Sequence, residues 1–185
     1  MLTGCVADAD PLEKARRAAE SGREIDFSEL NGAIAWLYIP GSSVNAPISV
    51  DGEGFFLQSA YNDTDFCDPV TVIYYPGYSS LEDLFTRNGA LDRFREIRIF
   101  TQDAWITWRV IGVSAYSDRH ILETYQGFHN ADNISLFLED VRQHRTMVRY
   151  IDPNEEVKGQ LLVLSTHMRE RENERFLVLA IPVDR

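Results

Sequence analysis

The residues best suited to chemistry lie near the C-terminal end of the sequence, at Ser165, His167 and Arg175. Because alternate residues of an extended strand share a face, Ser165 and His167 are candidates for the hydroxyl–imidazole pair of a serine hydrolase. The sequence places no carboxylate to orient the histidine, and neighbours on one strand face seldom point at each other. We therefore favour His167 as a hydrogen-bonding residue of a binding site over the hydrolase interpretation.

The two cysteines, Cys5 and Cys67, are the only thiols of the chain. Cys67 precedes the apolar run Val70–Tyr75 and Pro76 follows it, so an extended strand would separate the two by roughly 25–30 Å. We expect Cys67 to be a small buried or half-buried apolar residue rather than a catalytic nucleophile. Cys5 lies far from any strand pattern.

The sequence predicts neither a cofactor nor a metal site. Two cysteines cannot supply a disulfide framework or a four-thiolate metal centre. The spacing of His120, His129 and His144 matches no tight zinc signature. A metal-dependent mechanism is therefore not expected.

The overall composition is that of one soluble domain with an acidic surface. The 185 residues carry a formal net charge of −11, and 44% of them are hydrophobic, which suits a sizeable single core. Phosphate backbones demand clustered Lys and Arg, so nucleic acid is excluded as a partner class. Broad adsorption to anionic lipid is disfavoured for the same reason.

The N-terminal residues Leu2-Thr3-Gly4-Cys5 resemble a bacterial lipobox, in which the cysteine is acylated after signal cleavage. A lipobox needs an apolar stretch upstream, and none precedes these residues. Two interpretations stay open: a lipid anchor at Cys5 with a true start further upstream, or a chance match at a frayed terminus with a free thiol. No run approaches the roughly 20 apolar residues of a membrane span, so we expect membrane contact only through such an anchor.

Apart from its N-terminal end, the chain is predicted to be mainly β. Asp10 and Pro11 begin a helix that ends near Gly22, so residues 1–26 form a tail and helix ahead of a barrel domain at 27–185. Pro47 favours an edge position for the second strand. The predicted strands are Ile34–Ile39, Val44–Val50, Val70–Tyr75, Glu96–Thr101, Trp105–Tyr116, Leu161–Thr166 and Phe176–Val183.

Further helices are predicted at the periphery. One covers Leu81–Phe94 in one or two pieces, broken near Asn88-Gly89, and another follows Asp132, ahead of the penultimate strand. Closing about seven to eight such strands into a barrel removes exposed sheet edges. The predicted fold is therefore a closed β-barrel with peripheral helices.

These segments arrive in the order and spacing of the sortase family, class B in particular. Asn31–Gly41 (NGAIAWLYIPG) resembles the first barrel strand of that class, and Val44–Ile48 resembles its continuation. Leu161–Thr166 (LLVLST) is similar to the strand that leads to the sortase nucleophile. Arg175–Val178 is similar to the last strand, which opens with the catalytic arginine. The resemblance covers residues 27–183 and implies a sortase-type β-barrel.

The resemblance also implies the chemistry of transpeptidation. In that family a cysteine thiolate attacks a peptide carbonyl of a sorting signal, an arginine stabilises the oxyanion and a histidine transfers protons. At the matching positions this chain keeps Arg175, but His167 replaces the cysteine, and Tyr75 and Pro76 replace a glycine and the histidine. The covalent step thus loses both of its reacting groups.

Two functional interpretations follow from the resemblance. The favoured one is a catalytically inactive sortase homologue at the extracellular face of the bacterial membrane or cell wall, which binds a peptide or surface-protein segment in the former active groove. The expected ligand-binding residues are Tyr75, Tyr78, Thr166, His167 and Arg175. The two tyrosines flank the turn at Pro76, where the groove of the family opens. The alternative is an active sortase-like cysteine transpeptidase or peptidase that acts on sorting signals with a non-standard site.

Overall fold

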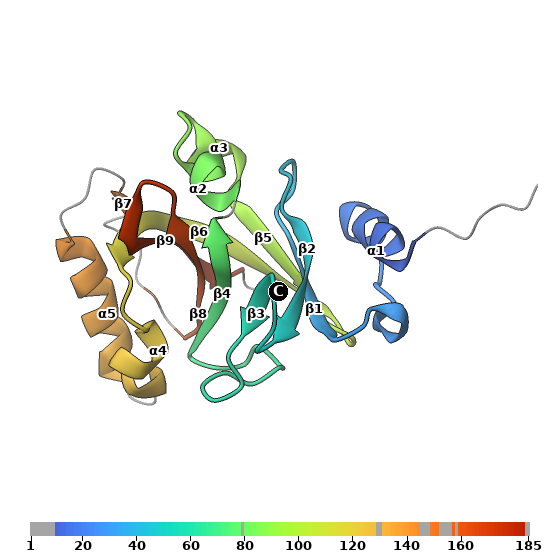
Figure 1. Cartoon of the computed structure of the whole chain (residues 1–185), viewed down its shortest axis with the longest axis horizontal. Helices are drawn as coiled ribbons and strands as arrows, with labels where there is room; N and C mark the ends of the chain where they lie inside the picture. Colours follow the sequence, from blue (N-terminus) through green and yellow to red (C-terminus); the bar gives the residue numbers. More distant parts are fainter. Residues whose placement is uncertain are drawn as a thin grey trace, which may run out of the picture.

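Nine strands pair in one sheet, in the order β5-β1-β2-β3-β4-β8-β9-β6-β7 (Figure 1). The structure is a computed structural model that describes residues 10–78, 80–128, 131–144, 149–151, 157 and 159–183. The strands are β1 (Ala33–Tyr38), β2 (Asn45–Val50), β3 (Phe55–Leu57), β4 (Val70–Tyr78), β5 (Glu96–Phe100), β6 (Trp105–Ser117), β7 (Arg149–Ile151), β8 (Leu161–Met168) and β9 (Arg171–Pro182). The helices are α1 (Pro11–Glu20), α2 (Ser80–Phe85), α3 (Ala90–Arg93), α4 (Ile121–Thr124) and α5 (Ala131–Gln143), with 3-10 turns η1 (Phe27–Glu29) and η2 (Gln126–Phe128).

A further pairing between β5 and β6 closes the sheet on itself. Eight strands therefore form a barrel, and β7 adds to it through β6. Most neighbouring strands are antiparallel, but β4 runs parallel to β8 and β2 runs parallel to β3. The predicted mainly β fold and closed barrel are confirmed, and α5 precedes the penultimate strand as expected.

The central strands are buried on both faces, which explains why their sequences are continuous apolar runs. Inside the barrel, Ile73 of β4, Leu164 of β8 and Phe176 of β9 are fully buried in the larger core cluster. On the outer face, Val163 of β8 belongs to a second cluster with Phe137 of α5. Figure 1 shows α4 and α5 on this side of β8 and β9. The outer face of these strands is thus a second packed layer.

The N-terminal helix α1 covers the opposite flank of the barrel, beside β1 and β2 (Figure 1). Ala15 and Ala19 of α1 share a cluster with Trp36, which is fully buried. Asn45 accepts a hydrogen bond from Trp36 Nε1 at 2.6 Å and donates to the Glu20 carboxylate at 3.1 Å, which ties the helix to the barrel. Among the described helices, none is long and apolar enough to cross a membrane.

Local features of the sheet differ from the sequence prediction at two places. The edge position predicted from Pro47 is wrong, because β2 lies between β1 and β3. Strand β2 pairs with β3 only from Ile48 onward, so Pro47, which has no backbone N–H, faces a single partner strand, β1. The strands β3 and β7 were not predicted, since three residues are too few to establish an alternating pattern.

The helix predicted over Leu81–Phe94 is present as two pieces, α2 and α3. The break falls at Gly89, which has a φ of 75° and precedes α3. Glycine adopts this left-handed conformation without steric cost. The predicted break near Asn88-Gly89 is therefore confirmed.

Candidate functional site

The hairpin of β8 and β9 brings His167 and Arg175 opposite each other in register. Strand β4 runs parallel beside β8 and pairs Tyr74 with Ser165 and Tyr78 with His167. Paired residues on neighbouring strands and alternate residues on one strand share a face. These five side chains therefore meet on the outer face of the barrel.

The guanidinium of Arg175 is the centre of this face, and only 8% of the residue is exposed. Its Nε donates to the Ser165 hydroxyl at 2.7 Å, and its Nη2 donates to the backbone oxygens of Tyr75 and Ser165 at 3.2 and 3.3 Å. Its Nη1 donates to Asp118 Oδ1 at 3.2 Å and lies 3.3 Å from His167 Nε2. A guanidinium has five N–H donors, so these contacts engage all of them within the protein.

Asp118 supplies the counter-charge of Arg175 and was not among the predicted site residues. Strands β6 and β9 are antiparallel with Tyr116 opposite Arg175, so a residue just beyond the end of β6 lies near the guanidinium. The Asp118 backbone N–H donates to the Asn173 oxygen at 2.9 Å, which holds the residue at this end of the sheet. Its side chain remains 40% exposed. The only signal for Asp118 is the pairing of β6 with β9, a contact between distant segments.

The imidazole of His167 lies beside both charges of this pair. Its Nε2 is 3.3 Å from Arg175 Nη1, and its Nδ1 is 3.9 Å from Asp118 Oδ1. Because arginine is only a donor, the contact with Nη1 assigns the lone pair to Nε2 and the proton to Nδ1. In this tautomer the ring accepts from Arg175 and directs its N–H toward Asp118.

The geometry of Ser165 gives no support to the serine hydrolase interpretation. Ser165 is fully buried, and its hydroxyl accepts from Arg175 Nε. Among the described contacts, none joins Ser165 Oγ to His167. A serine nucleophile needs a base within hydrogen-bond reach. Ser165 therefore positions the guanidinium instead.

Pro76 lies in an irregular stretch of β4, just before Tyr78, whose register partner is His167. The proline ring has no proton to give and no lone pair to accept one. The position that the resemblance assigns to the catalytic histidine thus carries no acid–base group. Tyr78 is 53% exposed, so its phenol ring is accessible beside His167.

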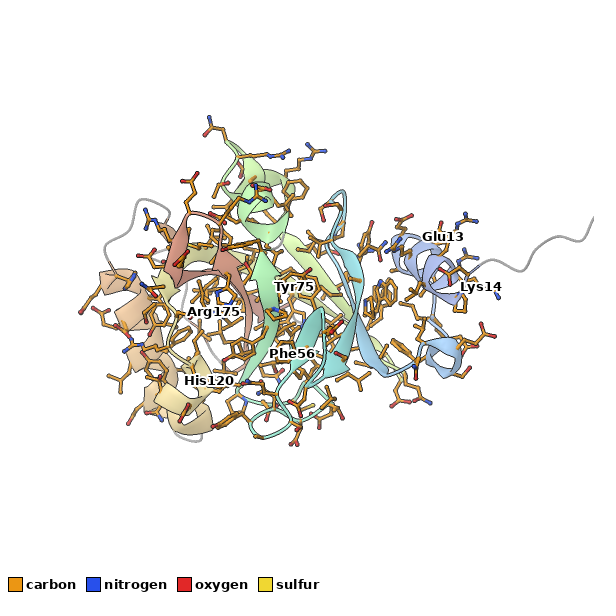
Figure 2. All side chains as sticks on the ribbon, in the orientation of Figure 1. Glu13, Lys14, Phe56, Tyr75, His120 and Arg175 are labelled. Atoms are coloured by element: carbon orange, nitrogen blue, oxygen red, sulfur yellow. The ribbon has the colours of Figure 1, made fainter. Side chains whose placement is uncertain are left out.

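Two of the predicted ligand-binding side chains, Tyr75 and Thr166, belong to the other face of the sheet. The Tyr75 ring packs on Phe55 at 4.9 Å, against the barrel interior, and Thr166 is fully buried. Figure 2 shows Tyr75 and Arg175 on opposite sides of the β4 ribbon. The register pair Tyr75–Thr166 alternates with the outward pairs on either side, so these side chains do not line the face that carries Arg175.

The aromatic side chain that faces Arg175 is Tyr74, the neighbour of the predicted Tyr75. The Arg175 Cζ lies 5.5 Å from the centroid of the Tyr74 ring, a cation–π distance. The same ring stacks with His120 at 5.4 Å. Burial raises the pKa of Tyr74 to about 12, so the phenol is neutral at physiological pH.

His120 connects the segment after β3 with the start of α4. Its Nδ1 accepts from the Glu123 backbone N–H at 3.0 Å and so caps α4, while its Nε2 bonds the Gln58 side chain. Burial lowers the pKa of His120, which favours the neutral ring whose Nδ1 lone pair accepts the capping hydrogen bond. Within the described residues no group of three or more His, Cys, Asp and Glu is placed to hold a metal ion. His129 lies outside those residues.

Cys67 lies at the opposite end of β4 from this site. Val70 pairs with Leu161 at that end, so the strand separates Cys67 from His167 by on the order of 25 Å. The prediction that Cys67 is buried or half-buried is wrong, because it lies in the loop before β4, where the residue is exposed. Desolvation and the nearby Asp65 raise the pKa of the Cys67 thiol. Cys5 and its lipobox-like segment lie outside the described residues.

No protein-family model and no curated protein matches the sequence. Solved structures do match. Sortase B from the type II pilus of Streptococcus pneumoniae superposes with a TM-score of 0.66 at 18% identity, over 85% of this chain and 96% of that chain. A mutant form of Clostridium perfringens sortase B gives a TM-score of 0.68 at 16% identity, over 95% of this chain and 93% of that chain.

A third structure, the Staphylococcus aureus sortase B–substrate complex, has a TM-score of 0.64 at 16% identity and covers 93% of this chain and 87% of that chain. At these identities the likeness concerns the arrangement of the strands and helices. The three superpositions cover between 85% and 95% of this chain. The chain therefore has the fold of the class B sortases.

Proposed function

We propose that this protein is a catalytically inactive sortase homologue that binds a peptide at the outer face around Arg175. The observation that carries the proposal is the residue opposite Arg175. His167 on β8 is in register with Arg175 and accepts a hydrogen bond from its guanidinium. A transpeptidase needs a thiolate at this position.

Three features of the site oppose a covalent mechanism. The described thiol, Cys67, lies at the far end of β4. Pro76 offers no proton transfer. The N–H groups of Arg175 are engaged by Ser165, Tyr75, Asp118 and His167, so none is directed at the place where an oxyanion would develop.

The same face retains groups that suit non-covalent binding. Tyr78 is 53% exposed, Asp118 40% and the His167 side chain 31%. Together they offer an aromatic surface, a carboxylate and an imidazole N–H to the backbone and side chains of an extended peptide. The solved S. aureus sortase B–substrate complex supports peptide binding on this fold. By the same resemblance, the proposed location is the extracellular face of a bacterial membrane or cell wall.

The test is incubation of the protein with a panel of sorting-signal peptides, with and without an amine acceptor. Mass spectrometry reports cleavage and any acyl-enzyme, and NMR titration reports binding. The proposal expects amide shifts near Tyr78 and His167 without cleavage. Tyr78→Ala should weaken binding about tenfold, whereas Leu136→Ala, which removes an exposed side chain of α5, should leave it unchanged.

An acyl-enzyme on any residue would refute the inactive interpretation and establish the alternative, an active transpeptidase with a non-standard site. Absence of binding by the whole panel would refute the peptide-binding part. Equal losses in the Tyr78 and Leu136 variants would place the peptide elsewhere on the protein.

A further inference from the structure

A side-chain bridge crosses the outer face of β4 next to the site around Arg175. His120, the N-cap of α4, bonds the side chain of Gln58, which directly follows β3. Strand β3 lies on one side of β4, whereas α4 follows β6, which lies on the other side beyond β8 and β9. The contact, which we call the His120–Gln58 bridge, therefore passes over β4. Figure 2 shows His120 and Phe56 of β3 on either side of this strand.

Tyr74 is the residue that the His120–Gln58 bridge covers. Its ring stacks with His120 at 5.4 Å and with Phe56 at 5.9 Å, and only 6% of the residue is exposed. The Tyr61 ring packs on the far part of this cover, 5.2 Å from His120. Further along β4, Tyr78 is 53% exposed. The outer face of β4 is thus closed at Tyr74 and open at Tyr78.

The hydroxyl of Tyr74 has no partner beneath this cover. Among the described residues, none reaches Tyr74 Oη at hydrogen-bond geometry, although the backbone N–H groups of Leu122 and Ile121 lie near it. A buried polar group without a partner costs free energy. Once the cover is removed, the phenol can bond water or a peptide carbonyl. The unpartnered hydroxyl therefore favours an open arrangement.

His120 makes both of its contacts only as the neutral imidazole. Its Nδ1 accepts from the Glu123 backbone N–H, so the ring proton lies on Nε2 and is donated to the side-chain oxygen of Gln58. A second proton, on Nδ1, would point at the Glu123 N–H and abolish the cap of α4. Protonation thus removes the contact that fixes His120 over β4.

The surroundings of His120 also oppose its protonation in the closed arrangement. Burial is the largest effect and lowers the pKa of His120; the Glu123 carboxylate raises it and the Arg175 guanidinium lowers it further. The other titratable groups against the ring are the phenols of Tyr61 and Tyr74. A ring released to water escapes the burial penalty, so a falling pH shifts the balance toward the open arrangement.

We propose that the His120–Gln58 bridge is a gate that opens when His120 is protonated and extends the peptide-binding face from Arg175 to Tyr74. This inference rests on the proposed function. With the gate closed, a peptide reaches only the exposed end of the face at Tyr78. With the gate open, the ring and hydroxyl of Tyr74 are available to the next residues of the same extended chain.

Hydroxyl-radical footprinting with mass spectrometry measures the accessibility of Tyr74 without any peptide. Oxidation of Tyr74 relative to the exposed Tyr78 should be low at pH 7.5 and should rise about fivefold at pH 5. Gln58→Ala removes the hydrogen bond of the bridge and should give a similar rise at pH 7.5. The matched control is Gln102→Ala, which changes an exposed glutamine before β6 and should behave as the parent protein does.

His120→Asn separates the gate from other effects of pH. Its side chain is too short to reach Gln58 and does not titrate, so Tyr74 should be oxidised equally at both pH values. The inward-facing Tyr75 reports on the barrel itself and should stay constant. Protection of Tyr74 in Gln58→Ala and at pH 5 would refute the gate. Oxidation of Tyr75 together with Tyr74 would also refute it, because the barrel and not the bridge would then have opened.

NMR titration of Gln58→Ala with the panel of sorting-signal peptides connects the gate to binding. A constant pH of 7.5 keeps the protonation of His167 unchanged. The shifted amides should extend to residues 56–61 and 120–124, and the affinity should rise about fivefold as more of the protein is open. Unchanged shifts and affinity, with Tyr74 oxidised, would show that the gate does not serve the peptide. Absence of peptide binding would refute the proposed function and not the gate, which footprinting decides alone.

Discussion

Arg175 Nη1 donates to Asp118 Oδ1 at 3.2 Å, although Arg175 lies on β9 and Asp118 lies just beyond the end of β6. The arginine that the sortase resemblance assigns to an oxyanion is thus bound to a carboxylate of its own chain. Because Arg175 is nearly buried and Asp118 is 40% exposed, the carboxylate lies on the solvent-facing side of the guanidinium. The contact links the end of β6 to β9.

Replacing Asp118 with Ala should destabilise the protein by about 1 kcal/mol, because a mostly buried guanidinium loses its counter-charge. The cost is no larger because solvent screens the interaction at the partly exposed carboxylate. Asp118→Asn should cost less, since its amide oxygen still accepts a hydrogen bond. The matched control is Asp83→Ala, which removes an ion pair of the same 3.2 Å length to the exposed Arg169 and should cost almost nothing. Urea unfolding measures all three. Equal costs for Asp118→Ala and Asp83→Ala would contradict this view of the site.

Restoring the two lost groups should reintroduce weak transpeptidase chemistry. We expect His167→Cys combined with Pro76→His to form a thioacyl intermediate with sorting-signal peptides, and either single change to form less. The inward packing of Tyr75 on Phe55 leaves the outer face open, so the tyrosine does not obstruct the new pair.

Adding Asp118→Ala to this double variant should raise the yield of intermediate by about tenfold, since it releases an Arg175 donor for the oxyanion. Mass spectrometry of the trapped intermediate measures the yield. The double variant with Asp83→Ala is the control. A yield that does not respond to Asp118 would show that Arg175 takes no part in the restored reaction.

Asn45→Ala should destabilise the protein by about 1–3 kcal/mol. The change leaves Trp36 Nε1, in a fully buried side chain, without its acceptor, and removes the link to Glu20 on α1. Trp36→Phe in the Asn45→Ala background tests the cause. If the lost indole bond is responsible, the two costs should be less than additive in urea unfolding. If the two costs add fully, the stability lost in Asn45→Ala comes from packing and not from the indole hydrogen bond.

The stability of the protein should fall as the pH drops below about 6.5, the ordinary pKa of histidine. Burial lowers the pKa of His120 in the folded state, so the unfolded chain takes up a proton first. Between pH 6.5 and the lower pKa of His120 in the folded state, protonation therefore favours unfolding. Below that pKa the loss of stability levels off.

His120→Asn keeps a side chain that can cap α4 and removes this titration. Its thermal midpoint should depend less on pH between 7 and 5 than that of the parent protein. The difference between the two curves isolates His120 from the other histidines. Parallel curves would contradict the assignment.

Much of the fold follows from patterns that are local in the sequence. Apolar runs bounded by turn residues located the long strands, and the break at Gly89 was visible because glycine favours a left-handed backbone. That His167 and Arg175 share one groove was implied by the resemblance of two segments to the family. These features depend on neighbours in the chain, so the sequence contains them directly.

Only the tertiary structure decided which side chains share the outer face. Tyr74 and Tyr75 end a run of apolar residues in a strand that is buried on both faces, so no alternation in the sequence tells which tyrosine faces Arg175. Asp118 reaches the guanidinium through the pairing of β6 with β9, and the exposure of Cys67 depends on how its loop leaves the barrel. Register and closure are set by contacts between distant segments, and therefore the sequence alone determined the barrel but not the composition of its site.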